Sequence, residues 1–398
     1  MLLLYKKVSF IEFSIGFFWL KIVTSARTGR QGLTGAMLKS HECFPDDMNE
    51  MFGSADSDMI EIDGNYKEGG GQIVRTALAL SAITQKPCRV TNIRKGRPAP
   101  GLKMQHLVAV RTLKEVSNAQ CTGDVLGSET LVFRPGPCRF RDITVDIQTA
   151  GSITLFLQAI LPPLLAADRA TTITVRGGTD VSWSQPVDHF ASVFLPVLQR
   201  RCPIFVKVVR RGYYPKGGGE VVLTITPPAP PEKKSSEPLR MTHYHEPHSV
   251  RIVSHSSALL KKPRVAERQA DAASAVLHTT GLTLVQEVDY YETDSPGSGI
   301  TIVAEGEGLC IGADALGKRG ISAEQVGREA ALMFIAQLRA QAPVDVFCAD
   351  QLIPFLGLWG GEIVTTAISD HTLTNIMVTE KFLPVRFLVE GTRIRALR

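Results

Sequence analysis

The feature that most constrains the fold is a regular alternation of short strand patterns with longer apolar helix patterns. The first strand pattern, at 59–63, alternates apolar and acidic residues, as the period of a half-buried strand requires. A helix pattern over 72–84 follows a run of glycines. Units of this kind begin near residues 59, 143 and 344, although the three copies share little sequence. The alternation predicts an α/β (α+β) fold of packed layers rather than a helix bundle.

The chain divides where this pattern is interrupted. Residues 227–248 are rich in Pro, Lys, Ser and His and predict a linker. A new set of strand and helix patterns then begins, and it includes a capping box at Ser322–Gln325. We therefore expect a large domain formed by 57–248 and 341–398, which carries the linker, and a smaller α/β domain inserted at 249–340.

The first 56 residues do not fit this plan. A basic start precedes a largely apolar stretch from Val8 to Val23, which is the arrangement of a secretory signal peptide. Because Glu12 and Lys21 interrupt the apolar run, no membrane-spanning helix is expected. We predict that residues 1–56 are an N-terminal extension, either disordered or translated from a start placed too early, and keep export as the alternative.

Composition bears on the compartment and on the partners. The chain has seven cysteines, an odd number, and no Cys-x-x-Cys pair. A disulfide framework or a cysteine zinc site is therefore not expected, and we predict a cytoplasmic protein without membrane association. There are 44 Lys and Arg residues and 39 Asp and Glu residues, and the resulting net charge of +5 suits a polyanionic partner without requiring one.

The segment Glu68-Gly-Gly-Gly-Gln-Ile-Val-Arg75 joins the first strand to the first helix. Glycines at a helix start let backbone N–H groups approach an anion, and the helix end adds partial positive charge. Arg75 in the first turn could donate two hydrogen bonds to one phosphate, and Glu68 could bind a divalent cation. The plainer interpretation is a strand-to-helix turn that binds nothing.

Two further loops combine basic residues with turn-forming residues. The stretch Arg94-Lys-Gly-Arg97 lies on a Pro- and Gly-rich loop that leads to Gln105 and His106. Loops on a rigid scaffold commonly carry binding groups. The stretch 211–220 combines aromatic and basic residues, which suits nucleic acid. A solvated basic loop and a hairpin capped by aromatic rings are the respective alternatives.

The segment Ser369–Asn375 follows a strand and begins a helix, with His371 in the first turn. A neutral histidine can be a covalent nucleophile, and a helix N-terminus disfavours the imidazolium while it favours an incoming phosphate. A lone histidine is usually structural or merely exposed. The place of His371 at the carboxyl end of a strand, where α/β proteins put their sites, favours function, and Asp350 and Gln351 on the preceding helix belong to the same constellation.

Two other patterns are rejected as sites. The stretch 312–319 nearly matches an ATPase P-loop, but Arg319 stands where a Ser or Thr should bind magnesium, so a turn is expected. A group of histidines lies in or beside the Pro-rich linker, and a disordered polar tract is expected there rather than a metal site. These histidines are His243, His245, His248 and His255.

Taken in order, the motifs resemble one family, the RNA 3′-terminal phosphate cyclases. The matching stretches run from Ile60 to Phe387 and are EGGGQIVRTALALS, IRKGRPAPGLKMQHL, TAGSITLFLQAILP, VRGGTD, RGYYPKGGGEV, LGKRG, ADQL and SDHTLTNIMVTEKFLPVRF. The resemblance implies three repeated βαβαββ-type units, like the C-terminal domain of a translation initiation factor. It also implies that the smaller α/β domain is inserted before the third unit.

The resemblance further implies an enzyme, a ligase that uses ATP to convert an RNA 3′-phosphate to a 2′,3′-cyclic phosphate through a covalent histidine–AMP intermediate. His371, in the family's His-x-Leu-Thr-Asn motif, is the implied nucleophile. The implied nucleotide- and phosphate-binding residues are Glu68, Arg75, Arg94, Arg97, Gln105, Phe347, Asp350 and Gln351. The implied cofactors are ATP and a divalent metal, Mg or Mn, held by Glu68. The implied partners are RNA 3′-phosphate ends, and a homodimer is left open.

The sequence departs from the family in the linker at 227–248 and at two further places within the matched region. Phe347 stands where the family often has Tyr, and adenine can stack on either ring. Residues 181–189 differ from the family's usual stretch, so no adenine contact is assigned there.

Two rival functions are weighed against the cyclase. One is a non-catalytic cyclase-like protein of ribosome assembly, and the retention of His371, Glu68 and Arg75 argues against it. The other is an enolpyruvyl transferase of broadly related fold, which has no need of a strand-end histidine in this motif.

Overall fold

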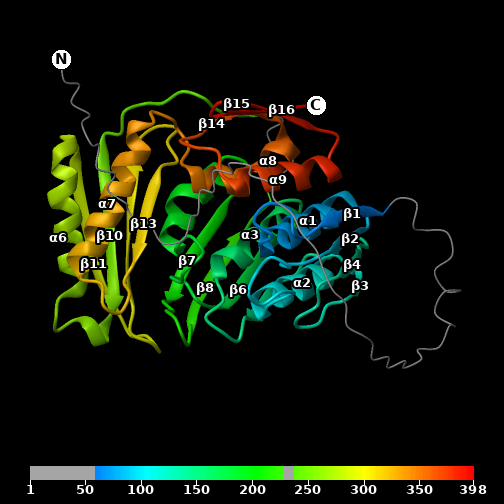
Figure 1. Ribbon diagram of the computed structural model, residues 1–398, viewed down its shortest axis with the longest axis horizontal. Helices are drawn as coiled ribbons and strands as arrows, with labels where there is room; N and C mark the ends of the chain where they lie inside the picture. Colours follow the sequence, from blue (N-terminus) through cyan, green and yellow to red (C-terminus); the bar gives the residue numbers. More distant parts are fainter. Residues whose placement is uncertain (1–58, 228–236) are drawn as a thin grey trace, which may run out of the picture. The chain divides into compact units, whose positions relative to one another are not determined.

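The computed structural model describes residues 59–227 and 237–398, so the extension expected at 1–56 lies outside the described residues (Figure 1). The described chain is a mixed α/β structure with four sheets of four strands each. The α/β class predicted from the alternating pattern is confirmed.

The first sheet grows from the alternating pattern at the start of the described chain. Its strands lie in the order β1, β2, β4, β3, and β1 and β2 are the parallel pair. Because a parallel pair needs a crossover, the chain passes through a helix between these two strands. The elements are β1 (Ile60–Asp63), α1 (Gly71–Thr84), β2 (Cys88–Thr91), α2 (Met104–Val116), β3 (Gln120–Thr122) and β4 (Leu131–Arg134).

The second sheet repeats this topology, with the order β5, β6, β8, β7 and a parallel pair formed by β5 and β6. Helices connect β5 to β6 and β6 to β7, and a loop connects β7 to β8. The elements are β5 (Ile143–Asp146), α3 (Ile153–Leu164), β6 (Thr171–Gly177), α4 (Val187–His189), the π-helical segment η2 (Phe190–Phe194), α5 (Leu195–Gln199), β7 (Ile204–Arg210) and β8 (Gly219–Ile225).

The third sheet has the order β15, β16, β14, β9 and the same pairing directions as the first two. Its elements are β9 (Leu239–Met241), α8 (Val346–Trp359), β14 (Gly361–Val364), α9 (Asp370–Phe382), β15 (Arg386–Glu390) and β16 (Arg393–Leu397). The stretch 227–248, predicted to be a linker, therefore contains a strand, because β9 pairs in parallel with β14. That prediction is wrong for residues 239–241.

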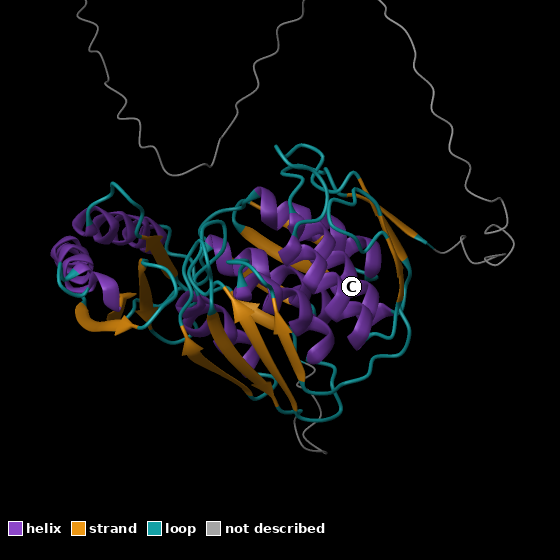
Figure 2. Ribbon diagram, turned by 90° about the horizontal axis from the view of Figure 1, so that it is seen from below, coloured by secondary structure: helices purple, strands orange, loops and turns teal. Residues whose placement is uncertain are grey.

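Residues 249–340 carry the fourth sheet, with the order β11, β10, β12, β13. Two helices pack together on one face of it (Figure 2). Its elements are β10 (Ser249–Ser257), η3 (Ala258–Leu260), α6 (Val265–Leu277), η4 (His278–Thr280), β11 (Thr283–Tyr291), β12 (Ser298–Glu305), β13 (Gly312–Leu316) and α7 (Ala323–Arg339). The P-loop-like stretch predicted to be a turn is thus a strand over Gly312–Leu316 and a turn only beyond it.

Two separate cores match this arrangement. Helices α1, α2, α3, α8 and α9 contact one another on the inner faces of the first three sheets. Large side chains that are fully buried there include Leu78, Phe133, Phe156, Phe190, Phe355 and Phe382. The fourth sheet buries its own set against α6 and α7, which includes Val250, Ile252, Leu277, Ile300 and Phe334. Among the described helices, none has both the length and the apolar content that crossing a bilayer would need.

A buried polar network joins the second sheet to the fourth. Arg211, which follows β7, lies 3.2 Å from a carboxylate oxygen of Asp180 and 2.8 Å from one of Asp188. The ring of His255 on β10 accepts or donates one hydrogen bond with the Tyr213 hydroxyl at 2.7 Å, and its other nitrogen faces the same two carboxylates. His255 is therefore a buried strand residue, and the prediction that placed it in a disordered tract is wrong.

We predict that Arg211→Met destabilises the fold by about 3–5 kcal/mol, because it leaves two buried carboxylates without their cation. Urea unfolding at neutral pH measures this change. The control is Arg89→Met, which removes an exposed ion pair with Glu61 on the first sheet and should change the unfolding free energy by less than about 1 kcal/mol. Equal effects of the two substitutions would contradict the structural role given to Arg211.

Candidate active site

The loop between β1 and α1 brings the helix N-terminus close to other polar groups. Gly69 has a φ of +54°, which is the left-handed region that favours glycine. Gly71 begins α1, and a Cβ there would lie 2.0 Å from Nε2 of His106, so no other residue leaves room for that ring. The N-cap of α1 is Gly70, which supplies no side-chain hydrogen bond to the first turn. The first N–H groups of α1 are thus available to an anion.

A second helix N-terminus meets the first. Ser369 caps α9, its hydroxyl accepting a hydrogen bond from the Thr372 backbone N–H at 2.9 Å. His371 follows in the first turn, and its Nε2 lies 3.0 Å from a carboxylate oxygen of Glu68. The Lys67 ammonium lies 2.9 Å from Asp370 and ties the two loops together. The predicted nucleophile and the predicted glycine-rich loop are therefore in contact.

The His371 ring is kept neutral. Burial, together with the positive charges of Arg75 and Arg97, lowers the pKa of His371 to about 4, while Asp370 opposes the change. At neutral pH the ring therefore carries a lone pair on one nitrogen, as a nucleophile requires. The side chain is still 32% exposed, so a substrate can reach it.

Arg75 is the cation best placed for a phosphate. Burial lowers the pKa of its guanidinium to about 10, so it keeps its charge at neutral pH. Among the described residues it forms neither a hydrogen bond nor an ion pair, although it is close enough to His371 and His106 to lower the pKa of both. A charged group held without a partner in a half-buried site favours an anionic ligand.

The other two predicted arginines differ from each other. A terminal nitrogen of Arg97 lies 3.6 Å from Glu68, within the same cluster. A terminal nitrogen of Arg94 donates instead to the backbone carbonyls of Ala99 and Gly101, at 2.7 and 2.9 Å. Arg94 thus holds the shape of its own loop with part of its guanidinium, and the loop carries Arg97.

Asp350 organises the turn before His371. One carboxylate oxygen of Asp350 accepts hydrogen bonds from the hydroxyls of Ser369, at 2.6 Å, and Thr372. Its backbone carbonyl accepts from the Asn375 side-chain amide at 2.6 Å. Burial raises the pKa of Asp350 to about 7, against the effect of these two hydroxyls. Asp350 therefore acts on His371 through the capping residues of α9.

The remaining predicted residues lie around this cluster. Phe347 and Gln351 lie one helical turn apart on the same face of α8. The Gln351 side-chain amide donates a hydrogen bond to the Phe347 backbone carbonyl at 3.1 Å. The other end of the Gln351 amide is buried and has no hydrogen-bond partner among the described residues. The Gln105 side-chain oxygen accepts from the Ser152 N–H at the start of α3, at 3.4 Å.

His106 was not among the predicted site residues, yet it is buried within the cluster. Burial, with the charges of Arg75, Arg94 and Lys103, lowers the pKa of His106 to about 3, so the ring is neutral. Its Nδ1 accepts from the Lys103 backbone N–H at 3.1 Å, which leaves the proton on Nε2, facing the start of α1. The sequence signal that could have found it is the pairing of Gly71, which lacks a side chain, with a histidine beside Gln105.

The residues that could hold a metal form two groups. Glu68 offers one carboxylate whose pKa is raised, first by burial, and a nearby cation would relieve that cost. Mg²⁺ in nucleotide sites commonly uses one or two carboxylates with water and phosphate oxygens, so the residue fits the expectation. Within residues 59–227 and 237–398, the only cluster of three such groups is Asp180, Asp188 and His255. The Arg211 guanidinium already contacts both carboxylates there, so a cation lies where a metal ion would have to bind.

A neutral histidine, a carboxylate and guanidinium groups at two helix N-termini are the parts of a phosphoryl-transfer site. The family model for RNA 3′-terminal phosphate cyclase matches residues 66–389. The RNA 3′-terminal phosphate cyclase of Pyrococcus furiosus is 45% identical over 335 residues, which cover 84% of this chain and 96% of that protein. The RNA 3′-terminal phosphate cyclase of Methanopyrus kandleri is 45% identical over 343 residues, which cover 84% of this chain and 96% of that protein. The one of Saccharolobus solfataricus is 42% identical over 339 residues, which cover 84% of this chain and 97% of that protein. The chain belongs to the RNA 3′-terminal phosphate cyclase family.

Two substitutions of charged neighbours should shift the pKa of His371 in opposite directions. Arg75→Gln removes a positive neighbour and should raise the pKa of His371 from about 4. Asp370→Asn removes a negative neighbour and should lower it further. NMR titration of the His371 ring measures both shifts, and Arg89→Gln on β2 is the control that should leave the pKa unchanged. Shifts of the same sign in the first two variants would show that the ring does not lie between these charges.

Proposed function

We propose that this chain is an ATP-dependent RNA 3′-terminal phosphate cyclase that works through an adenylated His371. A ring nitrogen of His371 attacks the α-phosphorus of ATP, an N–P bond forms, the bond to the bridging oxygen breaks, and pyrophosphate leaves. An oxygen of the RNA 3′-phosphate then attacks the same phosphorus and displaces the histidine, which gives an RNA–adenylate. The neighbouring 2′-hydroxyl attacks the terminal RNA phosphorus and loses its proton, and AMP leaves as the cyclic phosphate closes. The need for that hydroxyl makes RNA, and not DNA, the substrate that can be cyclised.

One observation carries this proposal: a neutral, accessible His371 lies 3.0 Å from Glu68, where the N-termini of α1 and α9 meet. It also lies beside Arg75, which has no partner among the residues that the structure describes. Phosphoryl transfer depends mainly on positioning and on neutralising charge, and this cluster supplies both. A non-catalytic relative would have no use for a histidine held neutral beside a free guanidinium. The identity to catalytic cyclases over most of the chain agrees with this choice.

The other residues take supporting roles. Arg75 and Arg97 would bind phosphates of ATP or of the RNA end, and the α1 N-terminus would bind a further oxygen. Phe347 would stack on the adenine, with Gln351 beside it. Glu68 would hold Mg²⁺ or Mn²⁺, which supplies positive charge to the leaving pyrophosphate when bound.

The strand order of the sheets bears on the internal repeats of the fold. The first three sheets share one strand order, which supports three βαβαββ-type repeats. Residues 249–340 would then be an insertion, and it interrupts the third repeat after β9 rather than preceding it. The odd number of cysteines and the lack of a Cys-x-x-Cys pair in the sequence support a cytoplasmic location.

Incubation with ATP labelled in its α-phosphate tests the nucleophile. His371→Asn should lose all acid-labile protein-bound AMP and all cyclisation, because no ring nitrogen remains to form the phosphoramidate. His278→Asn, an exposed histidine of the insert, is the matched control and should label normally. Full labelling of the His371→Asn protein would refute the assignment.

Single-turnover kinetics test the phosphate contacts. Losing one charge-assisted hydrogen bond costs roughly 1.5–3 kcal/mol, so Arg75→Lys and Arg97→Lys should slow adenylation or ring closure by about ten- to a few-hundred-fold. Lys cannot donate from a fixed fork, so the rescue should be partial. Arg94→Lys should act less directly, because part of that guanidinium holds the loop. Unchanged rates for Arg75→Lys and Arg97→Lys in both steps, at low and moderate salt, would place these arginines outside the site.

A further inference from the structure

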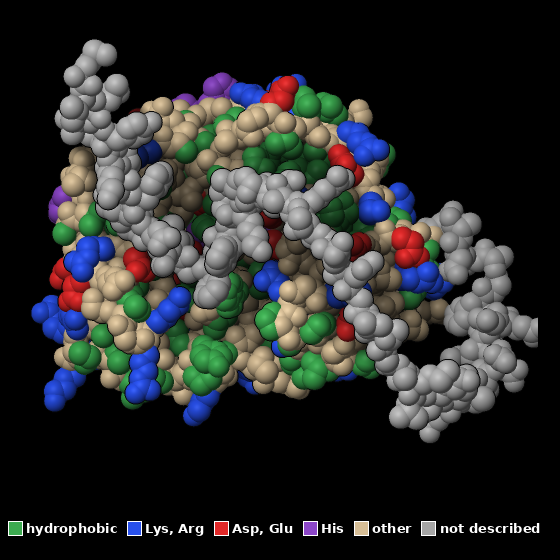
Figure 3. Space-filling view, viewed as in Figure 1, with side chains coloured by type: hydrophobic (Ala, Val, Ile, Leu, Met, Phe, Trp, Pro, Cys, Tyr) green, Lys and Arg blue, Asp and Glu red, His purple; other side chains and the backbone are tan. Residues whose placement is uncertain are grey.

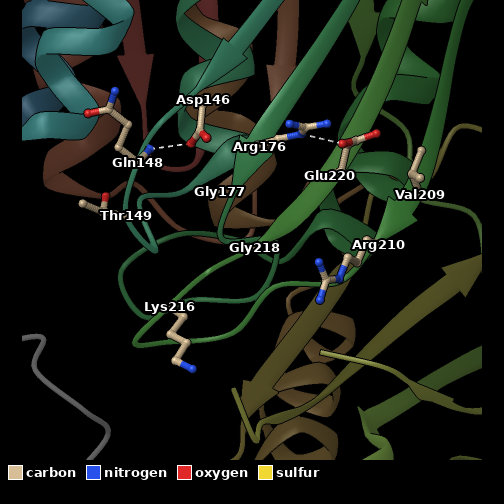
Figure 4. Close-up of a pocket in the computed structure, with 10 residues that line it drawn as sticks. All are labelled: Asp146, Gln148, Thr149, Arg176, Gly177, Val209, Arg210, Lys216, Gly218 and Glu220. Carbon is tan, nitrogen blue, oxygen red and sulfur yellow. Dashed lines mark hydrogen bonds and ion pairs between the residues drawn. The ribbon is translucent and has the colours of Figure 1, made fainter. Parts of the chain in front are cut away.

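A hollow lies at the end of the second sheet, and none of the residues that line it belongs to the His371 cluster (Figure 4). Its volume is about 430 Å³, and it is lined by the ends of β5, β6, β7 and β8 and by the loops that leave them. In Figure 4, Lys216 lies on the long loop before β8, across from the arginines that project from the strands. The lining includes the three cations Arg176, Arg210 and Lys216.

The loop that carries Lys216 has two buried residues that hold it in place and two exposed residues that a ligand can reach. Arg211 and Tyr213 are buried at 3% exposure, held by Asp180, Asp188 and His255. Tyr214, the next residue, is 75% exposed, and Lys216 is also exposed. The buried pair therefore fixes the place of the exposed pair, which lowers the entropy cost of binding a ligand there.

A second exposed aromatic ring lies beside this loop. Trp183 is 75% exposed, and with Tyr214 it is the most exposed large apolar side chain of the described residues. An isolated parallel β-bridge pairs Asp180 with Tyr213. Trp183 comes shortly after Asp180 in the chain and Tyr214 directly after Tyr213, so both rings lie close to this bridge in the sequence. Exposed rings next to a cation are the usual means of binding single-stranded nucleic acid, because every base offers a face for stacking.

One loop connects the hollow to the residues that border the His371 site. Thr149 lines the hollow, and a Cβ on Gly217 would lie 2.9 Å from the Thr149 carbonyl, so the two loops are in close contact. Three residues after Thr149, the Ser152 N–H donates to Gln105, which borders the His371 cluster. A strand whose 3′ end lies at His371 can therefore pass over this loop to the hollow.

The charge of the surface is modest. Arg176 pairs with Glu220 at 2.7 Å and Arg210 with Asp294 at 2.5 Å, whereas Lys216 forms no ion pair with a described residue. The face shown in Figure 3 carries both basic and acidic side chains. Stacking should therefore supply most of the affinity, with Lys216 as the main contact to a backbone phosphate.

We propose that Trp183, Tyr214 and Lys216 bind the nucleotides of the RNA substrate that lie upstream of its 3′-terminal phosphate. The two rings stack on bases, and the ammonium contacts a phosphate of the same strand. This inference rests on the proposed function, since it names where the body of that substrate lies.

The test compares an RNA of about ten nucleotides with a 3′-phosphate in cyclisation, and ATP alone in self-adenylation. Tyr214→Ala and Trp183→Ala should each raise KM for the RNA by about 5- to 150-fold, with unchanged kcat and unchanged self-adenylation. Tyr214→Phe keeps the ring and should keep the wild-type KM. Lys216→Ala should raise KM less and reduce the slope of log KM against log salt by about 0.7, one phosphate contact to a single strand.

The control is Phe205→Ala, an exposed ring at the far end of β7 from the hollow, which should leave KM unchanged. Wild-type KM in both Tyr214→Ala and Trp183→Ala would overturn the inference. An equal rise of KM in Phe205→Ala would also overturn it, because binding would then not depend on this hollow. Failure of the wild-type protein to self-adenylate would instead contradict the proposed function, so the two failures are distinguishable.

Discussion

The site depends on a buried chain of hydrogen bonds that fixes α1, α8 and α9 against one another. The Thr76 hydroxyl on α1 donates to the Asn375 side chain on α9 at 2.8 Å, and the amide of Asn375 donates to the Asp350 carbonyl on α8 at 2.6 Å. All three residues are buried, so a slipped helix would leave polar groups unpaired at a cost of about 1–3 kcal/mol each. This register brings Glu68, in the loop before α1, to within 3.0 Å of His371, in the first turn of α9.

Given that register, the charges of the site follow from burial. Removing His371 from water disfavours its protonated form, and the neighbouring guanidinium groups add to the effect. The same packing leaves Arg75 charged and without a partner among the described residues. A half-buried cation without a counter-charge is unfavourable, and an anion that binds beside it relieves that cost. A phosphate group of the substrate supplies such an anion next to the neutral nucleophile.

Much of this could be predicted from the sequence where the signal is local. Neighbouring residues in the sequence signal the strand-to-helix turns at Glu68 and His371. The structure has β1 and α1 around the first turn and β14 and α9 around the second. Contacts between remote segments left no such signal. The packing of His106 on Gly71 is signalled only by considering two residues far apart in the sequence together. The hydrogen bonds of Arg94 to its own loop also went unpredicted. Short strands such as β9 were missed because three residues give no period, and His255 looked like part of a polar tract because its partners, Asp180 and Asp188, lie far back in the sequence.

The central claim is that the geometry selects His371, and not the equally neutral His106, as the group that takes AMP. His106 is buried against α1, whereas His371 is accessible at the start of α9. The most direct measurement is to trap the adenylated wild-type protein at alkaline pH, digest it, and locate the AMP by mass spectrometry. The account predicts AMP on the peptide that contains His371, linked by an acid-labile bond. AMP on the peptide that contains His106, or on a lysine, would contradict it.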